Sequence, residues 1–447
     1  MQRALLRQLP KVDVLLRHPA LSGFAHDLVV SLAREEIDAL RAGVRSGAIT
    51  ELPDVAERVA ERARALGQGR LQPVINATGI VVHTNLGRAP WSQGARDAVQ
   101  HLTGYCDLEM DLDSGRRGGR LDGVRALARQ LTGAEDALVV NNCAAAVLLA
   151  LTALARDREV IVSRGELVEI GGSFRVPDVI ASGGARLVDV GTTNRTRIAD
   201  FAAAVGPDTA VLLRVHPSNF RVIGFTEEAP REALVALGRE HGLAVVEDVG
   251  SGSLTGALGE PSVREAVEAG VDVVLFSGDK LLGGPQSGLA FGRREAIQRM
   301  RKNPMYRALR VDKVILGAVE RTLADHVSGR VTPVDQMLHM SVADLERRAE
   351  ELAAALDDVG VVGQVVEDVG YVGGGALPGQ GLESRVVRVA CDSVGAVAHR
   401  LRMGDPPVVA RVTEGTLVLD PRTVAPDQVH TLAQRVAGAL SSAPEVE

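Results

Sequence analysis

The chain has 447 residues, 46% of them hydrophobic and 2% aromatic, which suits two or three domains with a sizeable core. A net charge of −7 excludes a polycation, and three widely spaced cysteines without a CxxC pair indicate neither disulfides nor a metal site, as expected in the cytoplasm. We expect no signal peptide and no membrane span, because the longest apolar run, residues 143–155, is shorter than the roughly 20 residues that cross a bilayer.

Residues 1–65 are predicted to form a helical N-terminal domain. Apolar residues such as Leu28, Val29 and Leu32 recur there at steps of three and four, as on one face of a helix. The first 70 residues hold 11 Lys+Arg and 9 Asp+Glu, a slight basic excess in an acidic chain. Residues 67–70, which include two glycines, are the predicted hinge to the next domain.

Residues 66–325 are predicted to form a large α/β domain. Short apolar strands alternate there with amphipathic helical segments such as 231–241, a pattern typical of a mostly parallel sheet flanked by helices. Such sheets bind ligands beyond the carboxyl ends of their strands. Long helices at 311–326 and 342–356 lead into a small C-terminal α+β domain, residues 326–447. The predicted strands are 137–140, 159–162, 210–213, 243–246 and 271–275.

Lys280 is the first candidate for chemistry. It follows the strand 271–275 and precedes a glycine-rich loop that contains Gly283 and Gly284. Glycines allow a planar ligand to approach closely, and a partly desolvated lysine at this sheet edge favours the neutral amine that forms Schiff bases. Ser277, three residues earlier, is a candidate ligand for a phosphate. The alternative for Lys280 is a surface lysine on a turn.

Two further strands end in polar side chains. Asp248 closes the strand that begins near 243, and a buried carboxylate is costly unless it pairs with a cation. A protonated pyridine nitrogen is such a cation, while an N-cap of the next helix is the alternative role. His216 and Asn219 follow the strand 210–213, and Asn219 is a candidate donor to a ring oxygen of the same ligand.

The segment Asn142-Cys143-Ala144 stands where a strand ends and a helix begins. Free backbone N–H groups and the positive end of the helix dipole make such a place suitable for a phosphate. The alternative is an ordinary strand-to-helix turn capped by asparagine.

The order and spacing of these segments resemble those of pyridoxal-phosphate (PLP) enzymes of fold type I. More specific stretches resemble the bacterial L-seryl-tRNA(Sec) selenium transferases, or selenocysteine synthases, over essentially the whole chain. These stretches are residues 75–90 (INATGIVVHTNLGRAP), 108–112 (LEMDL), 115–120 (GRRGGR), 303–313 (NPMYRALRVDK) and, in the N-terminal region, 9–13 (LPKVD).

This resemblance implies the conversion of L-seryl-tRNA(Sec) to L-selenocysteinyl-tRNA(Sec) with selenophosphate, through a PLP-bound aminoacrylyl-tRNA intermediate. Lys280 would hold PLP and move the Cα proton, with Asp279 beside it among the catalytic residues. Arg88, Arg307 and Arg310 are the candidate hosts of selenophosphate, because guanidinium groups bind phosphate-like anions in bidentate fashion. Arg307 and Arg310, three residues apart on a predicted helix, are expected to share one face.

Two other functions are weighed against this one. A PLP-dependent β-eliminating lyase acting on a small amino acid or amino-sugar acid would share the residues from about 75 onward, but has no use for a helical N-terminal extension. A catalytically silent RNA-binding descendant has no need of Lys280, Asp248 and Ser277. For residues 1–65, a dimerisation arm is the alternative to a tRNA-binding domain. The resemblance also implies a homo-oligomeric ring built from dimers, a decamer.

Overall fold

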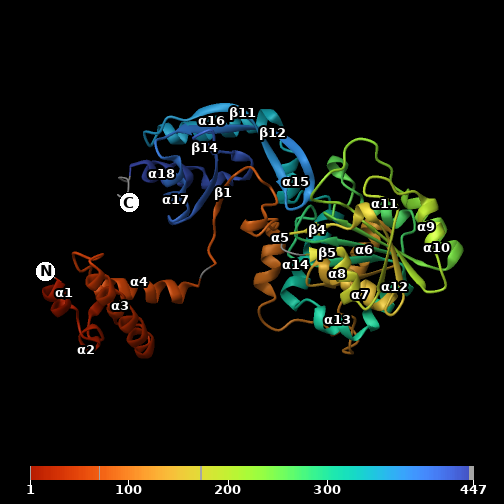
Figure 1. Cartoon of the computed structure of the whole chain (residues 1–447), viewed down its shortest axis with the longest axis horizontal. Coiled ribbons are helices and arrows are strands. Elements are labelled where there is room, and N and C mark those ends of the chain that lie inside the picture. The colour runs from red at the N-terminus through yellow and green to blue at the C-terminus, as the bar shows by residue number, and fades with distance from the viewer. Residues whose placement is uncertain (1, 70, 172–173, 442–447) are drawn as a thin grey trace. The chain divides into compact units, whose positions relative to one another are not determined.

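The structure, a computed structural model, describes residues 2–69, 71–171 and 174–441. It divides into two compact units, Met1–Val74 and Ile75–Glu447, and each is described by itself (Figure 1). Every helix in the described ranges is too short or too polar to cross a lipid bilayer.

The N-terminal unit is helical. It contains α1 (Gln2–Gln8), α2 (Val12–Leu15), α3 (His26–Ser46) and α4 (Val55–Gln68). The buried residues of α3 and of α4 recur at helical spacing, so each helix has one apolar face. These two faces pack against each other. Glu36 is buried in this contact, and Arg58 compensates its charge with an Nε–Oε1 distance of 2.6 Å.

The large sheet of the second unit has seven strands in the order β2-β10-β9-β8-β7-β3-β6. All neighbouring pairs are parallel except those of β10, which runs antiparallel to both β9 and β2. The sheet is therefore mostly parallel, as predicted. Its strands are β2 (Asp136–Val140), β3 (Glu159–Ser163), β6 (Arg186–Val190), β7 (Thr209–Val215), β8 (Ala244–Gly250), β9 (Val273–Ser277) and β10 (Gly288–Gly292).

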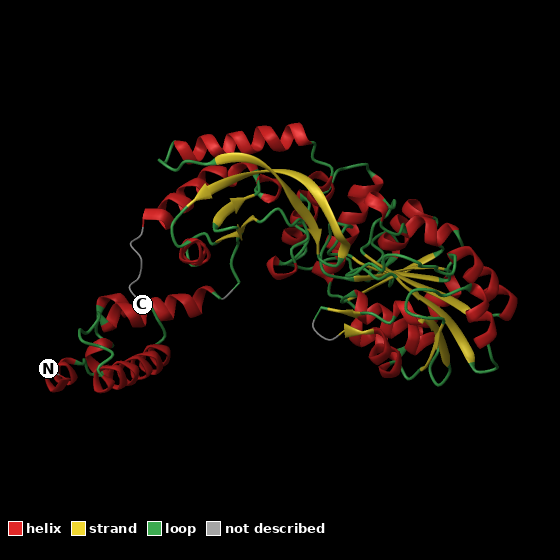
Figure 2. Ribbon diagram, turned by 45° about the horizontal axis from the view of Figure 1, so that its top comes forward, coloured by secondary structure: helices red, strands yellow, loops and turns green. Residues whose placement is uncertain are grey.

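Helices lie on both sides of this sheet (Figures 1 and 2). The central helix α7 packs on β2, β7, β8, β9 and β10, and it is apolar nearly all round because it is buried between the sheet and other helices. The helices of this part are α5 (Gln93–His101), α6 (Asp122–Thr132), α7 (Cys143–Leu154), α8 (Val176–Ser182), α9 (Ile198–Ala204), α10 (Arg231–His241), α11 (Val263–Glu268), α12 (Arg294–Lys302), α13 (Pro304–Leu309), α14 (Lys313–Val327) and α15 (Pro333–Leu338).

A second, five-stranded sheet has the order β1-β13-β14-β12-β11 and packs against helices α16, α17 and α18. Its two longest strands, β11 and β12, form a hairpin that curves away from the rest of the small sheet (Figure 2). The elements are β1 (Ile75–Ala77), β11 (Gln364–Gly373), β12 (Ala376–Ala390), β13 (Val408–Thr413), β14 (Thr416–Leu419), α16 (Val342–Asp357), α17 (Val394–Arg402) and α18 (Val429–Ser441).

The elements cross the predicted domain boundaries at three places. Helix α4 continues beyond residue 65 and helix α14 beyond residue 325. Strand β1, within the predicted catalytic range, pairs in parallel with β13 of the small sheet, because its apolar residues Ile75 and Ala77 are buried in that core. The three-domain division stays a prediction about independently folding parts.

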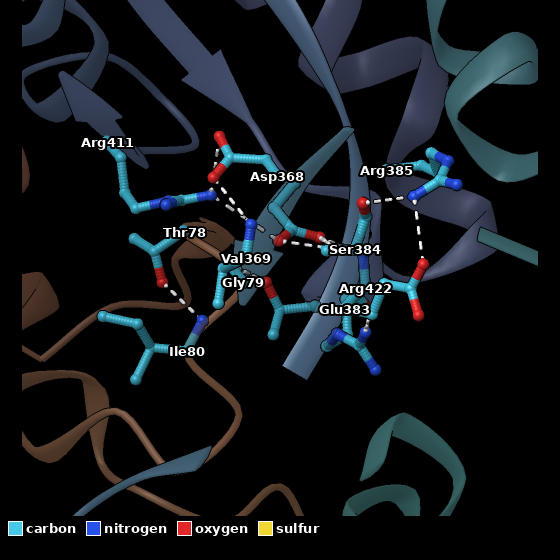
Figure 3. A network of polar contacts seen from close by, with 12 residues as sticks. Thr78, Gly79, Ile80, Asp368, Val369, Glu383, Ser384, Arg385, Arg411 and Arg422 are labelled. Carbon is cyan, nitrogen blue, oxygen red and sulfur yellow. Dashed lines mark hydrogen bonds and ion pairs between the residues drawn. The ribbon is translucent and has the colours of Figure 1, made fainter. Parts of the chain in front are cut away.

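A buried polar network fixes the chain just after β1 (Figure 3). Asp420, fully buried, accepts hydrogen bonds from Ser384 Oγ at 3.1 and 3.0 Å. Arg411 Nη2 lies 3.6 Å from Asp368 and 3.8 Å from Asp420. Gly79 passes over this carboxylate with φ +72°, and a Cβ there would lie 2.0 Å from Asp420 Oδ2. The network therefore requires a glycine at this turn.

Candidate active site

The carboxyl ends of β7, β8 and β9 bring the predicted site residues together. Val215 pairs with Asp248 across β7 and β8, and Asp248 pairs with Leu275 across β8 and β9. Lys280 follows β9 directly, and only 7% of its surface is exposed. The structure therefore places a buried lysine and a buried aspartate at the ligand edge of the sheet, as the strand pattern predicts.

Asp248 is a buried carboxylate with few partners. Its Oδ1 accepts from the Gly250 N–H at 2.9 Å and from the Cys143 thiol at 3.3 Å. Burial raises the pKa of Asp248, and the Cys143 bond and the charge of Lys280 oppose that rise. Burial likewise raises the pKa of the Cys143 thiol well above its usual value, so the thiol stays a neutral donor. A cation brought to Asp248 would stabilise its charged form.

The loop before α7 has the geometry of a helix N-terminus. Asn142 is its N-cap, and Asn142 Oδ1 accepts from the Ala145 N–H at 2.8 Å. The side chain of Cys143 turns toward Asp248, and Ala144 stays partly exposed. Strand β10 approaches this loop so closely that a Cβ on Gly288 would lie 2.0 Å from the Asn142 carbonyl oxygen.

The surroundings of Lys280 fit a ring-bearing phosphate ligand such as PLP. Ser218 Oγ and Ser251 Oγ are buried and have no hydrogen bond within the described residues. Both serines flank the lysine. Ser218 and Lys280 both border Gly375, and the Ser251 carbonyl accepts from the Leu281 N–H at 2.9 Å. Buried polar atoms without partners are expected where a ligand supplies the missing bonds.

His216 and Asn219 differ in their placement. Burial lowers the pKa of His216, and the nearby carboxylate of Glu260, with an Nε2–Oε2 distance of 3.8 Å, opposes that shift. Asn219 is exposed, and its Nδ2 donates to the Glu169 carbonyl at 2.8 Å. The amide is thus engaged on the surface of the loop, and Ser218 instead of Asn219 is the buried polar residue of this segment.

Of the three candidate arginines, Arg88 and Arg310 lie beside the site loops. Arg88 Nη1 donates to Asp279 Oδ2 at 2.6 Å, and Arg88 has a left-handed φ of 65°. Such strain in a non-glycine residue persists only where surrounding contacts hold it, and it is common at functional sites. The Leu309 carbonyl accepts from the Asn141 N–H at 3.0 Å, which brings the start of Arg310 beside the loop before α7.

The shared helix face expected for Arg307 and Arg310 is wrong. Helix α13 ends at Leu309, and Arg310 is its C-cap with extended backbone (ψ 142°), because the chain turns there toward the following helix. Arg310 Nη1 lies 3.8 Å from Glu109 Oε1, whereas Arg307 is exposed in the last turn of α13.

Comparison with known proteins assigns the family. The model of the L-seryl-tRNA selenium transferase family matches residues 74–425, and that of the selenocysteine synthase N-terminal region matches residues 6–41. The chain belongs to this family. An L-seryl-tRNA(Sec) selenium transferase of Moorella thermoacetica is 48% identical over 462 residues, which cover 99% of this chain and 98% of the relative. Those of Hyphomonas neptunium and Desulfomicrobium baculatum are each 46% identical over 94% of this chain and 96% of their own.

A solved structure of D-glucosaminate-6-phosphate ammonia-lyase shares the fold. Its TM-score is 0.60 at 22% identity, and the match covers 88% of this chain and 100% of that one. The predicted fold class, that of PLP-dependent fold type I enzymes, is confirmed for this selenium transferase family member.

Two glutamates of this chain were not among the residues predicted from sequence. Glu166 and Glu260 line a cavity of about 400 Å³ together with His216 and Arg214. Burial raises the pKa of Glu166 to about 8, and its Oε2 accepts from the Val215 N–H at 2.9 Å. Neither glutamate belongs to a recognisable motif, and their burial depends on contacts between distant parts of the chain.

Proposed function

We propose that this chain converts L-seryl-tRNA(Sec) to L-selenocysteinyl-tRNA(Sec), with pyridoxal 5'-phosphate as cofactor and selenophosphate as selenium donor. The observation that carries the proposal is the family match over residues 74–425, which includes the buried Lys280 at the ligand edge of the large sheet.

PLP, when bound, withdraws electrons from the substrate and so stabilises negative charge at the α-carbon. The Lys280 amine would hold the cofactor and then carry the proton to and from the α-carbon of the serine. Asp248 would keep the ring nitrogen protonated, which its burial at the strand end supports. The N–H groups of Asn142-Cys143-Ala144 and the hydroxyls of Ser218 and Ser277 are the groups that would hold the phosphate.

Selenophosphate is an anion, and we assign it to the arginines beside these loops. Arg88 is oriented by its ion pair with Asp279, the neighbour of Lys280, which links the donor site to the lysine. Arg310 lies next to the candidate phosphate loop, and Arg307 is accessible at the end of α13. Replacing Arg307 or Arg310 by alanine is expected to slow selenium transfer while leaving seryl-tRNA binding largely intact.

For the tRNA we propose the N-terminal unit. Six of its cationic residues are exposed and form no ion pair with a described residue, so they are available to phosphates. They are Arg3, Arg7, Lys11, Arg17, Arg34 and Arg45. Charge reversal at Arg7 and Arg17 is expected to weaken seryl-tRNA binding and flatten its salt dependence, whereas reversal at the ion-paired Arg41 serves as the matched control. Equal effects in both variants would contradict the assignment.

The resemblance further implies a homo-oligomer built from dimers, a decamer, and we propose this assembly for the chain. Light scattering of the purified protein measures its mass directly. A fully active monomer would contradict the proposal.

The deciding experiment is incubation of the purified protein with seryl-tRNA(Sec) and selenophosphate, followed by identification of the amino acid on the tRNA. Selenocysteine is the expected product, and Lys280→Ala is expected to be colourless and inactive with the fold intact. Release of ammonia from D-glucosaminate 6-phosphate is the parallel assay for the lyase alternative. Lyase activity without selenocysteine formation would overturn the proposed function.

A further inference from the structure

The tip of the β11–β12 hairpin lies beside the candidate lysine. Its turn consists of Gly373, Gly374 and Gly375, all with positive φ between 64° and 78°, a conformation that glycine adopts without strain. A Cβ on Gly375 would lie 3.9 Å from Lys280 Nζ and 3.6 Å from Ser218 Oγ. The tip therefore covers one side of the amine with bare backbone.

One side of this tip packs on the segment that follows β1. The Val82 N–H donates to the Val372 carbonyl at 2.7 Å, and a Cβ on Gly374 would lie 2.6 Å from Val82 Cγ1. Val82 and Leu377 share a buried apolar cluster with Leu281, the neighbour of Lys280. The hydrogen bond fixes the strand that enters the turn, at Val372, whereas the apolar packing around Leu377, on the strand that leaves the turn, is not directional.

A second directional contact holds the strand that leaves the turn, at Leu377. Glu260 Oε1 accepts from the Leu377 N–H at 2.7 Å, and the side chain of Glu260 is almost wholly buried. Leu377 itself has a left-handed φ of 51°, which a leucine keeps only where its surroundings hold it. Glu260 comes from the loop between β8 and α11, so this bond ties the small-sheet hairpin to the large sheet.

We propose that Glu260 is a positioning residue that latches the glycine tip of the β11–β12 hairpin over Lys280. Its reach sets the distance between tip and amine, and the side-chain-free turn leaves room for the bulky ester of an aminoacyl-tRNA. The aminoacyl-tRNA ester as the substrate under the tip rests on the proposed function, whereas the hydrogen bond between Glu260 and Leu377 does not.

The two oxygens of Glu260 allow reach and charge to be separated. Oε1 holds the tip, while Oε2 has no hydrogen bond within the described residues and faces His216 Nε2 at 3.8 Å. Glu260→Gln keeps an acceptor oxygen at the same reach and loses the charge. Glu260→Asp keeps the charge but withdraws the carboxylate by about 1.5 Å, one C–C bond. If Glu260 acts as a latch, its hydrogen bond to the Leu377 N–H is therefore kept in Glu260→Gln and lost in Glu260→Asp.

Hydrogen exchange of the full-length protein followed by mass spectrometry tests this contact. Peptides covering 371–377 are expected to exchange about 10- to 100-fold faster in Glu260→Asp and Glu260→Ala, and as in the wild type in Glu260→Gln. Peptides of β7 are expected to be unchanged in all variants. Glu228→Gln, a change at an exposed carboxylate of the same cavity, is the matched control.

The rate at which hydroxylamine releases bound cofactor gives a second readout. This rate is expected to rise about tenfold in Glu260→Asp and Glu260→Ala and to stay as in the wild type in Glu260→Gln. With seryl-tRNA, the aspartate variant is expected to lose up to about 100-fold in kcat/KM. The inference is overturned if glutamine behaves like alanine while aspartate resembles the wild type, if no variant changes the tip, or if β7 also exchanges faster. The exchange arm uses no tRNA, so failure of the proposed function leaves it standing.

Discussion

Replacing Glu166 by glutamine should make stability less sensitive to pH. Glu166 Oε2 accepts from the Val215 N–H, and a glutamine oxygen can accept the same bond. Burial raises the pKa of this carboxyl from 4.5 to about 8. Between these values the folded protein holds a proton that the unfolded chain has lost, so the wild-type free energy of unfolding falls as pH rises from about 4.5 to about 8.

The size of the effect follows from the same two values. A rise from 4.5 to about 8 corresponds to about 5 kcal/mol at 1.36 kcal/mol per pKa unit. Glu166→Gln carries no such penalty. Its stability is therefore expected to match that of the wild type near pH 4.5 and to exceed it by up to about 5 kcal/mol above pH 8.

Urea unfolding at a series of pH values between 5 and 9, at one protein concentration, measures this difference. Glu228→Gln, which lies on the same cavity but whose carboxylate is exposed, removes only a minor cause of the raised pKa of Glu166 and is expected to stay close to the wild-type curve. Parallel curves for Glu166→Gln and wild type, or a less stable glutamine variant at pH 9, would refute the reasoning.

Three further predictions concern buried charges and one glycine. Asp248→Asn is expected to bind the cofactor more weakly and to lose orders of magnitude in turnover, as seen by absorbance titration and steady-state rates; a near-normal rate would make Asp248 a structural residue. Arg231→Met leaves Glu247 without its bidentate partner at 2.7 and 2.9 Å and should lower the free energy of unfolding in urea by about 3–5 kcal/mol. Most of this stability should return when Glu247 is also made apolar. Gly79→Ala forces a Cβ against Asp420 at positive φ and should lower stability by at least about 1–2 kcal/mol; an unchanged Tm contradicts the described network.

Most strands of the large sheet could be predicted from sequence, and the two that were missed have physical reasons. Strand β6 mixes charged and apolar residues because it lies at the sheet edge. Strand β10 begins and ends with glycine, which weakens its strand signal. Both glycines are needed, since a Cβ on Gly288 would meet the Asn142 carbonyl at 2.0 Å and one on Gly292 the Asp272 carbonyl at 2.1 Å.

The site residues that follow buried strands could be predicted, because parallel strands deliver their carboxyl ends to one edge. Lys280 and Asp248 are of this kind. Asn219 and Arg310 were harder, since their placement depends on where a loop turns and where a short helix ends. Glu260 had no signal, because its partner Leu377 lies 117 residues away along the chain.

Because β1 pairs with β13, part of this fold can form only late in the synthesis of the chain. Residues 75–77 leave the ribosome early, but their hydrogen-bonding partners at 408–410 are made more than 300 residues later. At about 5–20 residues per second this delay lasts roughly 20–70 s. Throughout that time the segment leading to Arg88 lacks this pairing. A nascent chain interrupted before β13 contains Lys280 and Asp248, but its edge strand β1 has no partner strand. Vectorial synthesis thus postpones the pairing of β1 to the last stage of chain synthesis.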